Sequence, residues 1–394
     1  MDTRPGRMQV AGYDWPLVCA VLLLVFCGLV MVYSASSAIA LRRFGEEAFY
    51  VRRQIMFALF GGFLLIVLKN VPYTVYRTLA YPLLVLAFAM LVALMIPGLG
   101  TRVGGATRWF RLGPMSFQPA EFARFAVVVY LAYSMSKKGE AMADFAVGVL
   151  PHLLFTGILA GLMLMQPDFG SGVLLALITG FMLFLGGARL RHLGVTALAM
   201  APFLIVFLLV SDYRMKRIMS FFEPDGHMYA GAYQAWHSLM AFGSGGISGV
   251  GIGAGLQKLF YLPEPHTDFV FAVLGEELGL WGVLFVLALY SIVIWRGLSL
   301  ARRVPDLFAT YLAAGLVLSI GLPAATNIAV TMKLLPTKGL TLPFLSYGGT
   351  SLAVSLACVG ILNSIAAAHA PVLAGPKKNV KVAKRGKKEC ATAA

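Results

Sequence analysis

Long uninterrupted apolar segments are the feature that most limits how this chain can fold. Residues 16–39 and 308–330 are two examples, and neither contains a charged residue. Of the 394 residues, 59% are hydrophobic and 12% are charged, whereas a soluble domain has about 45–50% and 25%. A bilayer accepts such segments as helices or in closed barrels, and their lack of strict alternation favours helices. The sequence therefore predicts an all-α polytopic membrane protein.

About ten spans can be marked along the chain, and an even number places both termini on the same side of the membrane. We expect one membrane domain over residues 1–370 and a basic, disordered tail over residues 371–394. The predicted spans lie near residues 16–39, 54–70, 78–97, 117–135, 145–165, 171–187, 194–211, 268–295, 308–330 and 350–370.

The distribution of positive charge sets the expected orientation. Outside the tail, Lys and Arg divide almost evenly between the two sides, so the positive-inside rule does not decide. The tail run KKNVKVAKRGKK is most easily kept in the cytoplasm beside anionic lipid. Both termini are therefore predicted to be cytoplasmic, and the tail itself is interpreted mainly as a solvated segment.

A long loop over residues 212–267 is predicted on the outer side, between spans seven and eight. Its segment 243–255 is rich in glycine but has no GxxxxGK[ST] pattern, so we do not interpret it as a phosphate-binding loop. We expect tight turns packed against the membrane surface. The four cysteines form no CxxC motif or Cys/His cluster, so we expect neither a disulfide nor a metal–thiolate site.

Three carboxylates lie at the predicted start of span eight, in PEPHTDFVFAVLGEELGLWG (263–282). Asp268 follows the long loop and is adjacent to His266, which favours a functional role because ionisable groups at membrane depth are costly. The alternative is a capping role, with Thr267 as N-cap and Asp268 in the first turn. Glu276 and Glu277 point about 100° apart on a helix, and we assign both to structural pairing.

A second set of charges lies in SFQPAEFARF (116–125). Glu121 and Arg124 are three residues apart on one helical face and can form an ion pair. This pair is either a structural salt bridge or a site where Arg124 binds phosphate and Glu121 orients it, because a guanidinium binds oxyanions in a bidentate manner. Asp168 lies in QPDFGSG, which predicts a turn or a broken helix lining a cavity.

Residues 334–351 (LLPTKGLTLPFLSYGGTS) are too rich in Pro and Gly for a simple span, and they hold Lys338 and Ser346. We interpret them as a re-entrant or surface-lying loop on the outer side. The four segments then meet at one membrane face, where carboxylates and cations lie together. This combination fits a ligand with a lipid tail and phosphates.

Several motifs together resemble the SEDS family (shape, elongation, division and sporulation) of bacteria. The resemblance covers roughly residues 13–370, and PTKGLTLPF is more similar to the division member than to the elongation member. The motifs are GATRW (105–109), FQPAEF (117–122), QPDFG (166–170), YRMKRIMSF (213–221), the 234–238 region with GSGGISGVGIG (243–253), LPEPHTDFVFAVLGEELG (262–279) and PTKGLTLPFLSYGGTS (336–351).

The resemblance implies a ten-span SEDS fold and a peptidoglycan glycosyltransferase that polymerises lipid II at the outer face of the inner membrane. The essential acid of the family falls on Asp268, and its acid–base pair falls on Glu121 and Arg124. The family usually has Lys at the position of Arg124, so here a planar guanidinium group replaces a compact ammonium group. Further substrate contacts are expected from Arg108, Gln118, His266, Lys338 and Ser346.

The expected mechanism is a single inverting displacement at the anomeric carbon of the donor sugar. Asp268 would act as general base on the acceptor hydroxyl, and undecaprenyl pyrophosphate would leave. Arg124, neighbouring arginines or a divalent cation would stabilise the pyrophosphate. Glu121 and Asp168 are candidate ligands for Mg²⁺ or Mn²⁺, because carboxylate oxygens suit these ions.

The implied partners are a class B penicillin-binding protein (the division transpeptidase), other divisome membrane proteins, lipid II and undecaprenyl lipid, and no nucleic acid. The implied location is the bacterial inner membrane at the division septum. Two alternatives stay open. A lipid II flippase would need charged groups through the membrane for alternating access, and a non-catalytic scaffold for a transpeptidase would not need Asp268.

Overall fold

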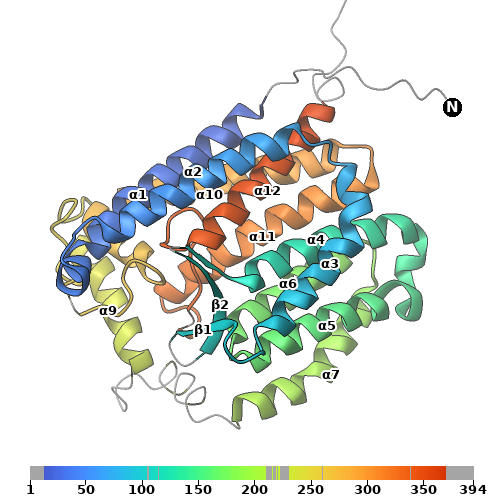
Figure 1. The fold of residues 1–394 in the computed structure, drawn as a ribbon, viewed down its shortest axis with the longest axis horizontal. Coiled ribbons are helices and arrows are strands. Elements are labelled where there is room, and N and C mark those ends of the chain that lie inside the picture. Colours follow the sequence, from blue (N-terminus) through green and yellow to red (C-terminus); the bar gives the residue numbers. More distant parts are fainter. Residues whose placement is uncertain are drawn as a thin grey trace, which may run out of the picture.

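The computed structural model describes residues 13–369 except 104–105, 114, 210–214, 216–218, 220, 222–229, 260 and 338. Long helices that run alternately up and down the molecule make up most of this part (Figure 1). They are α1 (Trp15–Phe44), α2 (Phe49–Asn70), α3 (Val75–Ala93), α4 (Pro119–Lys138), α5 (Leu150–Met165), α6 (Phe169–Leu185), α7 (Leu190–Leu209), α9 (Ala230–Gly245), α10 (Val270–Arg303), α11 (Leu307–Thr331) and α12 (Gly349–Ala368).

The helical membrane fold predicted from the sequence is confirmed. Seven helical stretches in the described part of the chain are long and apolar enough to cross a membrane. They are Trp15–Phe44, Phe49–Asn70, Val75–Ala93, Phe145–Met165, Val270–Arg303, Leu307–Thr331 and Gly349–Ala368. Helices α4, α6 and α7 cover the other three predicted spans and are not among these seven. The total of ten spans therefore stays a prediction.

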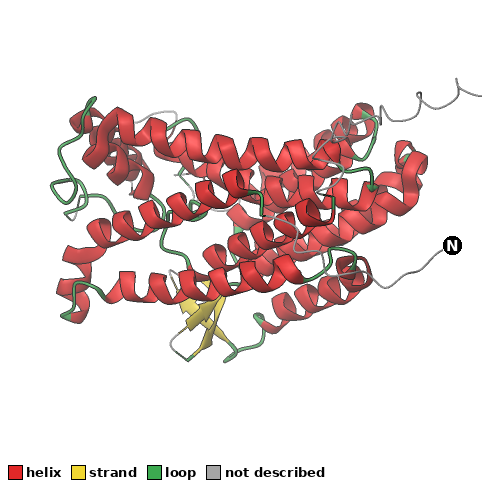
Figure 2. Cartoon of the chain, turned by 90° about the horizontal axis from the view of Figure 1, so that it is seen from above, coloured by secondary structure: helices red, strands yellow, loops and turns green. Residues whose placement is uncertain are grey.

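A small antiparallel sheet is the element that the all-α prediction missed. Strands β1 (Gly100–Val103), β2 (Ala106–Leu112) and β3 (Met115–Phe117) pair in the order β1-β2-β3, and Phe110 lies opposite Phe117. The sheet lies beside the helices (Figure 2) and connects α3 to α4. The strands are too short to show a clear alternating pattern in the sequence, which is why helical periodicity dominated the prediction.

The two ends of the described chain lie at the same end of the helical bundle. The backbone N–H of Asp14 donates to Asn363 Oδ1 at 2.9 Å, which joins the start of α1 to the end of α12. Arg296 from the C-terminal half of α10 forms an ion pair with Asp14 at 2.8 Å. This agrees with an even number of crossings, while the side of the membrane on which this end lies stays a prediction.

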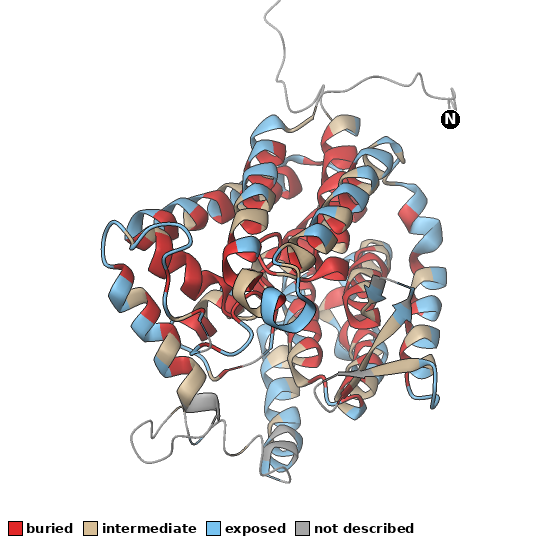
Figure 3. Cartoon of the chain, turned by 60° about the vertical axis from the view of Figure 1, so that its left-hand side comes forward, coloured by how far each residue is buried: buried red, intermediate tan, exposed pale blue. Residues whose placement is uncertain are grey.

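Helices α11 and α12 form the centre of the bundle. Within the apolar windows of these helices 72% and 78% of the residues are buried, compared with 22% in α2 (Figure 3). Peripheral helices expose large apolar side chains such as Leu59 and Phe63. Such side chains are stable at a surface that contacts lipid rather than water. The buried centre therefore holds the loops at both ends of α11 and α12 in fixed positions.

Helix α10 is interrupted at Gly279, whose backbone has φ 64° and ψ −159°. The interruption is filled by the glycine-rich segment 243–255. Amides of Val250 and Gly251 donate to the carbonyls of Glu276 and Glu277 at 3.0 Å each, and Leu280 N–H donates to Gly246 O at 3.0 Å. A broken helix is tolerated within a membrane protein where other backbone groups satisfy its free ends.

Glycine is required where the segment 243–255 and α10 touch. A Cβ at Gly245 would lie 2.0 Å from the carbonyl oxygen of Gly275, and a Cβ at Gly279 would lie 2.3 Å from Gly249 N. The sequence predicted turns packed against the membrane surface. The tight turns are present, with positive φ at Gly246, Gly249, Gly251 and Gly253. They pack closely against α10, and their contact with the membrane surface stays a prediction.

The predicted outer loop 212–267 contains one described helix, α9, followed by turns that lead to α10. Most of residues 212–229 lie outside the described residues, as does the predicted tail 371–394.

Replacing Gly279 by alanine should destabilise the fold. The left-handed conformation and the contact with Gly249 together should lower the free energy of unfolding by about 1–3 kcal/mol. Gly62→Ala is the matched control, because a Cβ at this position in α2 meets open space. Thermal unfolding of both variants in detergent measures the effect, and equal midpoints for the two would contradict the proposed constraint.

Candidate functional site

Asp268 lies directly before α10 and is held there through its backbone. Asn327, near the end of α11, donates from Nδ2 to Asp268 O at 2.9 Å and to Leu340 O at 2.5 Å. The N-cap of α10 is Phe269, and no acidic residue lies in the first turn. The capping interpretation with Thr267 as N-cap was therefore wrong, because the helix begins two residues later than that interpretation requires.

The carboxylate of Asp268 is half-buried against the loop that precedes α12. A Cβ on Gly339 would lie 3.0 Å from Asp268 Oδ2, so glycine leaves room for the carboxylate at this contact. The next residue, Leu340, packs against the start of α6, where a Cβ on Gly170 would lie 2.9 Å from the Leu340 side chain. Residues 339–340 thus connect Asp268 to the segment that contains Asp168.

Asp168 is surrounded by hydrogen-bond donors. It caps α6 by accepting from Ser171 N at 3.4 Å, and Gln118 Nε2 donates to it at 3.3 Å. Arg108 of β2 lies 3.9 Å from the same carboxylate and also donates from Nε to Gln166 O at 3.4 Å. The sheet is therefore fastened to the turn between α5 and α6 at this end of the bundle.

Glu121 and Arg124 form the ion pair that their spacing predicted. Both lie in the first turns of α4, and each is 7% exposed. Gln118, the N-cap of α4, donates its backbone N–H to Thr350 Oγ1 at 3.0 Å. The start of α4 is thereby joined both to α12 and to Asp168. Because both side chains are almost fully buried, Arg124 and Glu121 form part of the inner wall of the site and present little surface to a ligand.

His266 and Ser346 are buried in the loops that frame Asp268. The imidazole of His266 lies between Tyr50 and Tyr347, with ring centroids 4.4 and 5.7 Å away. Burial, with a smaller effect from Arg43, lowers the pKa of His266 to about 4, so the ring is neutral at pH 7. Ser346 Oγ accepts from Leu342 N at 2.8 Å, which closes a turn in the loop before α12. Lys338 lies outside the described residues.

Glu276 and Glu277 each bind a different part of the loop before α10. Glu277 forms a buried ion pair with Lys258 at 2.6 Å and accepts from Ser34 Oγ of α1 at 2.6 Å. Glu276 accepts from the backbone N–H of Leu256 at 2.8 Å. Both carboxylates nevertheless reach the same stretch of the loop, because a Cβ on Gly255 would lie 2.8 Å from Glu276 Oε2 and 3.2 Å from Glu277 Oε1. Both therefore hold the loop in position.

The sequence analysis did not single out Lys258, Ser34 or Asn327. Nothing in the residues around Lys258 distinguishes it from the other Lys and Arg residues of the predicted outer loop. Asn327 is 1% exposed within an otherwise apolar stretch of α11, and a lone amide there indicates a buried hydrogen-bonding role.

An apolar groove of about 510 Å³ begins beside this site and runs along the bundle. It lies between α2, α3, α4 and α12, and its lining is almost entirely apolar. Ser116, Phe117 and Thr350 line its mouth next to Gln118. A hydrocarbon chain could therefore lie in the groove while a polar group reaches the charged end.

The carboxylates of Glu121 and Asp168 do not form a cation site in this arrangement. Glu121 is paired with Arg124, and Asp168 is surrounded by Gln118, Ser171 N and Arg108. In the described residues no three His, Cys, Asp or Glu side chains gather as a metal site would require. A requirement for Mg²⁺ or Mn²⁺ therefore stays a prediction.

Comparison with known proteins gives matches over nearly the whole described chain. The family model described as cell cycle protein FtsW/RodA/SpoVE matches residues 15–370. The chain is 43% identical over 359 residues to the probable peptidoglycan glycosyltransferase FtsW of Trichlorobacter lovleyi, which covers 91% of this chain and 94% of that protein. It is 39% identical over 354 residues to stage V sporulation protein E of Bacillus subtilis, covering 89% and 96%.

Solved structures share the fold. A chain from a peptidoglycan synthase complex, described as coordinating polymerization and crosslinking, superposes with a TM-score of 0.75 at 28% identity and covers 91% of this chain and 98% of that one. The rod shape determining protein RodA of Thermus thermophilus superposes with a TM-score of 0.66 at 29% identity, covering 91% and 97%.

Breaking the buried ion pair should be costly. Lys258→Met leaves the carboxylate of Glu277 buried without its cation, which should lower the free energy of unfolding by about 3–5 kcal/mol. Adding Glu277→Gln should recover more than half of the loss. Arg52→Met is the control, because it breaks the exposed Arg52–Glu46 pair and should cost at most about 1 kcal/mol. Thermal unfolding midpoints compare the three, and similar losses for both single variants would contradict the role of burial.

Acid should weaken the loops that frame Asp268. The folded protein holds His266 neutral down to about pH 4, whereas the unfolded chain takes up a proton near pH 6.5. The stability that this difference contributes is present above pH 6.5 and is lost as the pH falls toward 4. The unfolding midpoint of His266→Gln should therefore fall less than that of the wild type between about pH 7.5 and pH 5. Parallel curves would contradict the assignment.

Proposed function

The chain belongs to the FtsW/RodA/SpoVE family of cell cycle proteins, and we propose that it is a peptidoglycan glycosyltransferase that polymerises lipid II with Asp268 as general base. The position of Asp268 supports this proposal. Its carboxylate is half-buried, its backbone is anchored by Asn327, and it lies against Gly339 at the end of the bundle where Asp168, Gln118 and Arg108 also gather.

The reaction needs one base and one cationic region. The hydroxyl of the acceptor sugar attacks the anomeric carbon of the donor, its proton passes to Asp268, and the bond from that carbon to the pyrophosphate oxygen breaks. A single displacement inverts the anomeric configuration, so a second carboxylate nucleophile is not needed. Asp268 can hold this role because Asn327 anchors its backbone and Gly339 leaves room for its carboxylate.

Positive charge for the leaving pyrophosphate comes from two arginines of different accessibility. The side chain of Arg108 is 32% exposed and lies beside Asp168. Arg124 is buried against Glu121, so its positive charge would act on the pyrophosphate from within the wall of the site. A preorganised cation in a region of low dielectric stabilises developing negative charge strongly. Arg108 is therefore the more direct contact of the two for the pyrophosphate.

The apolar groove between α2, α3, α4 and α12 suits the undecaprenyl tail of the substrate. Its volume of about 510 Å³ and its apolar lining match a hydrocarbon chain, and its mouth adjoins Gln118. A tail in this groove would bring the attached pyrophosphate toward Arg108 and Asp168.

The proposed setting is the inner membrane at the division septum, with both termini in the cytoplasm and a class B penicillin-binding protein as partner. Similarity to FtsW proteins supports the division role, and similarity to a chain of a peptidoglycan synthase complex supports a transpeptidase partner. The chain has a similar identity to a sporulation protein. Localisation of the protein during growth would therefore separate a division role from a sporulation role.

Replacing Asp268 should abolish polymerisation. With fluorescent lipid II and the purified protein bound to its transpeptidase, Asp268→Asn should slow glycan formation by at least about 100-fold, because general base catalysis typically contributes that much. Glu264→Gln is the matched control, since this side chain lies in the same loop and is 54% exposed. The control should form wild-type glycan ladders.

Three other outcomes would contradict this proposal. Equal ladders from wild type and Asp268→Asn would remove Asp268 from the mechanism. If no variant forms ladders while lipid II crosses vesicle membranes, the protein is a flippase. If neither activity is present but the transpeptidase still binds, the protein is a scaffold.

A further inference from the structure

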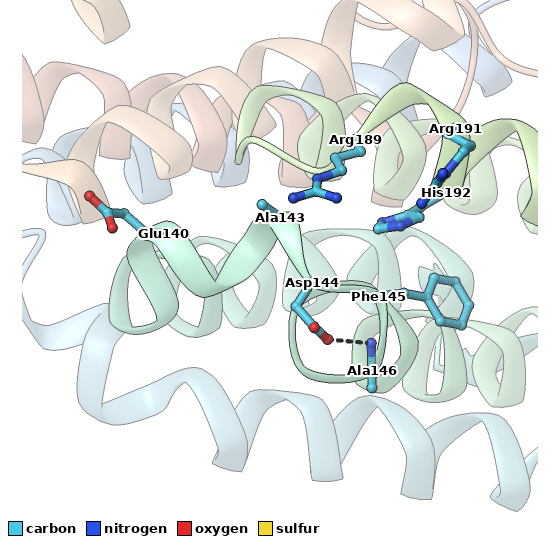
Figure 4. Close-up of a pocket in the computed structure, with 8 residues that line it drawn as sticks. All are labelled: Glu140, Ala143, Asp144, Phe145, Ala146, Arg189, Arg191 and His192. Atoms are coloured by element: carbon cyan, nitrogen blue, oxygen red, sulfur yellow. Dashed lines mark hydrogen bonds between the residues drawn. The ribbon is translucent and has the colours of Figure 1, made fainter.

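A second cavity, with a polar lining, lies at the end of the bundle opposite Asp268. It has a volume of about 580 Å³ and opens between the hairpin that follows α4 and the turn from α6 to α7 (Figure 4). Its charged and aromatic lining residues are Glu140, Asp144, Phe145, Arg189, Arg191 and His192. Nothing in the glycosyl transfer step uses these residues, because the helices between the two ends cross the whole bundle.

The two arginines of the cavity are not neutralised by neighbouring acids. Within the described part of the chain, the side chains of Arg189 and Arg191 form no ion pair with a carboxylate at 4.0 Å or less. Asp144 is occupied by the backbone, because its carboxylate accepts from Ala146 N at 2.8 Å (Figure 4). Glu140 points away from the space beside Arg189 in the same view.

His192 adds a polar group without a partner. Its Nδ1 is buried and has no hydrogen-bond partner. The ring is held edge-on against Phe145, with the ring centroids 5.5 Å apart. Figure 4 shows the guanidinium of Arg189 and the imidazole of His192 directed toward the same space, beside Ala143. A ligand with several acceptor oxygens would satisfy the guanidinium groups that face this space.

The backbone fixes the positions of the two arginines. Gly187 has φ 92°, and Ala188 N–H donates to Leu183 O at 3.0 Å, which ends α6 in a tight turn. Arg189 follows this turn directly, and Arg191 lies at the start of α7. The cationic side chains are therefore presented by a defined turn and a helix start.

Exposed aliphatic side chains lie near the lining residues of the cavity along the chain. Leu190 is 69% exposed, Val147 is 52% exposed and Val195 is 59% exposed. Exposed aliphatic residues beside arginines are expected where acyl chains meet headgroups. A soluble anion would gain nothing from them, whereas a lipid would contact both sets of groups.

We propose that this cavity binds the phosphate of an anionic phospholipid headgroup, with Arg189 and Arg191 as its cationic contacts and the acyl chains lying against Leu190 and Val195. Arginine suits this ligand because its planar fork binds two phosphate oxygens at once. The headgroup chemistry is that of a phosphodiester whose negative charge is not balanced by an amine. The proposal is independent of the glycosyltransferase activity.

Native mass spectrometry of the full-length protein in detergent tests the proposal, with phosphatidylglycerol, phosphatidylcholine and sodium phosphate as probes. The wild type should retain phosphatidylglycerol with at least about tenfold higher affinity than phosphatidylcholine, and Arg189→Gln/Arg191→Gln should lose that preference. Arg302→Gln/Arg303→Gln is the matched control. It removes the same charge from exposed arginines at the same end of the bundle, in the last turn of α10. Its preference should be unchanged.

Three results would overturn the proposal. Equal retention of the two lipids by the wild type would exclude recognition of the anionic headgroup. An equal loss in both double variants would show that general positive charge, rather than the cavity, attracts the lipid. Displacement of phosphatidylglycerol by sodium phosphate at low millimolar concentration would identify soluble phosphate as the ligand. The unfolding midpoints of both double variants should lie within a few degrees of the wild type. A loss of lipid preference is then a loss of binding and not of folding.

Discussion

The structure depends on how the interruption of α10 is compensated inside an apolar environment. At Gly279 the helix loses hydrogen bonds, and the carbonyls of Glu276 and Glu277 turn to the amides of Val250 and Gly251. The carboxylates of the same two glutamates bind Lys258, Ser34 and the Leu256 amide. Unsatisfied polar groups are costly in hydrocarbon, so the loop and the broken helix stabilise each other. The chain that leaves this loop leads directly to Asp268.

The two ends of the bundle differ in their chemistry. At the Asp268 end, carboxylates, amides and arginines engage one another through short contacts across the starts of α4, α6 and α10. At the opposite end, Arg189 and Arg191 face an open cavity in which Asp144 accepts from the Ala146 amide and Glu140 points away from the space beside Arg189. Between the ends lies an apolar groove that opens near Gln118. This arrangement suits a protein whose substrate and surroundings are both lipids with charged headgroups.

Much of the local arrangement was predictable because it depends on spacing along one helix. Glu121 and Arg124 pair as their three-residue spacing predicts, and Glu276 and Glu277 have the structural pairing role that was assigned to them. The alternating direction of the spans predicted that the segments around Glu121, Asp168 and Asp268 would meet residues 334–351 at one end of the bundle. The sheet over 100–117, the true start of α10 and the packing of the glycine-rich segment were not predictable, because each depends on contacts between residues far apart in the sequence.

The sequence by itself determined a helical membrane protein and the residues available for chemistry at one end of it, because apolar run length and helical spacing are local properties. Only the tertiary structure decided which of those residues meet. Asp268 lies beside Gly339 because Asn327 of α11 joins two distant loops, and Lys258 is a buried partner rather than a surface cation because α1 and α10 enclose it. Such contacts arise from packing across hundreds of residues, which no local pattern encodes.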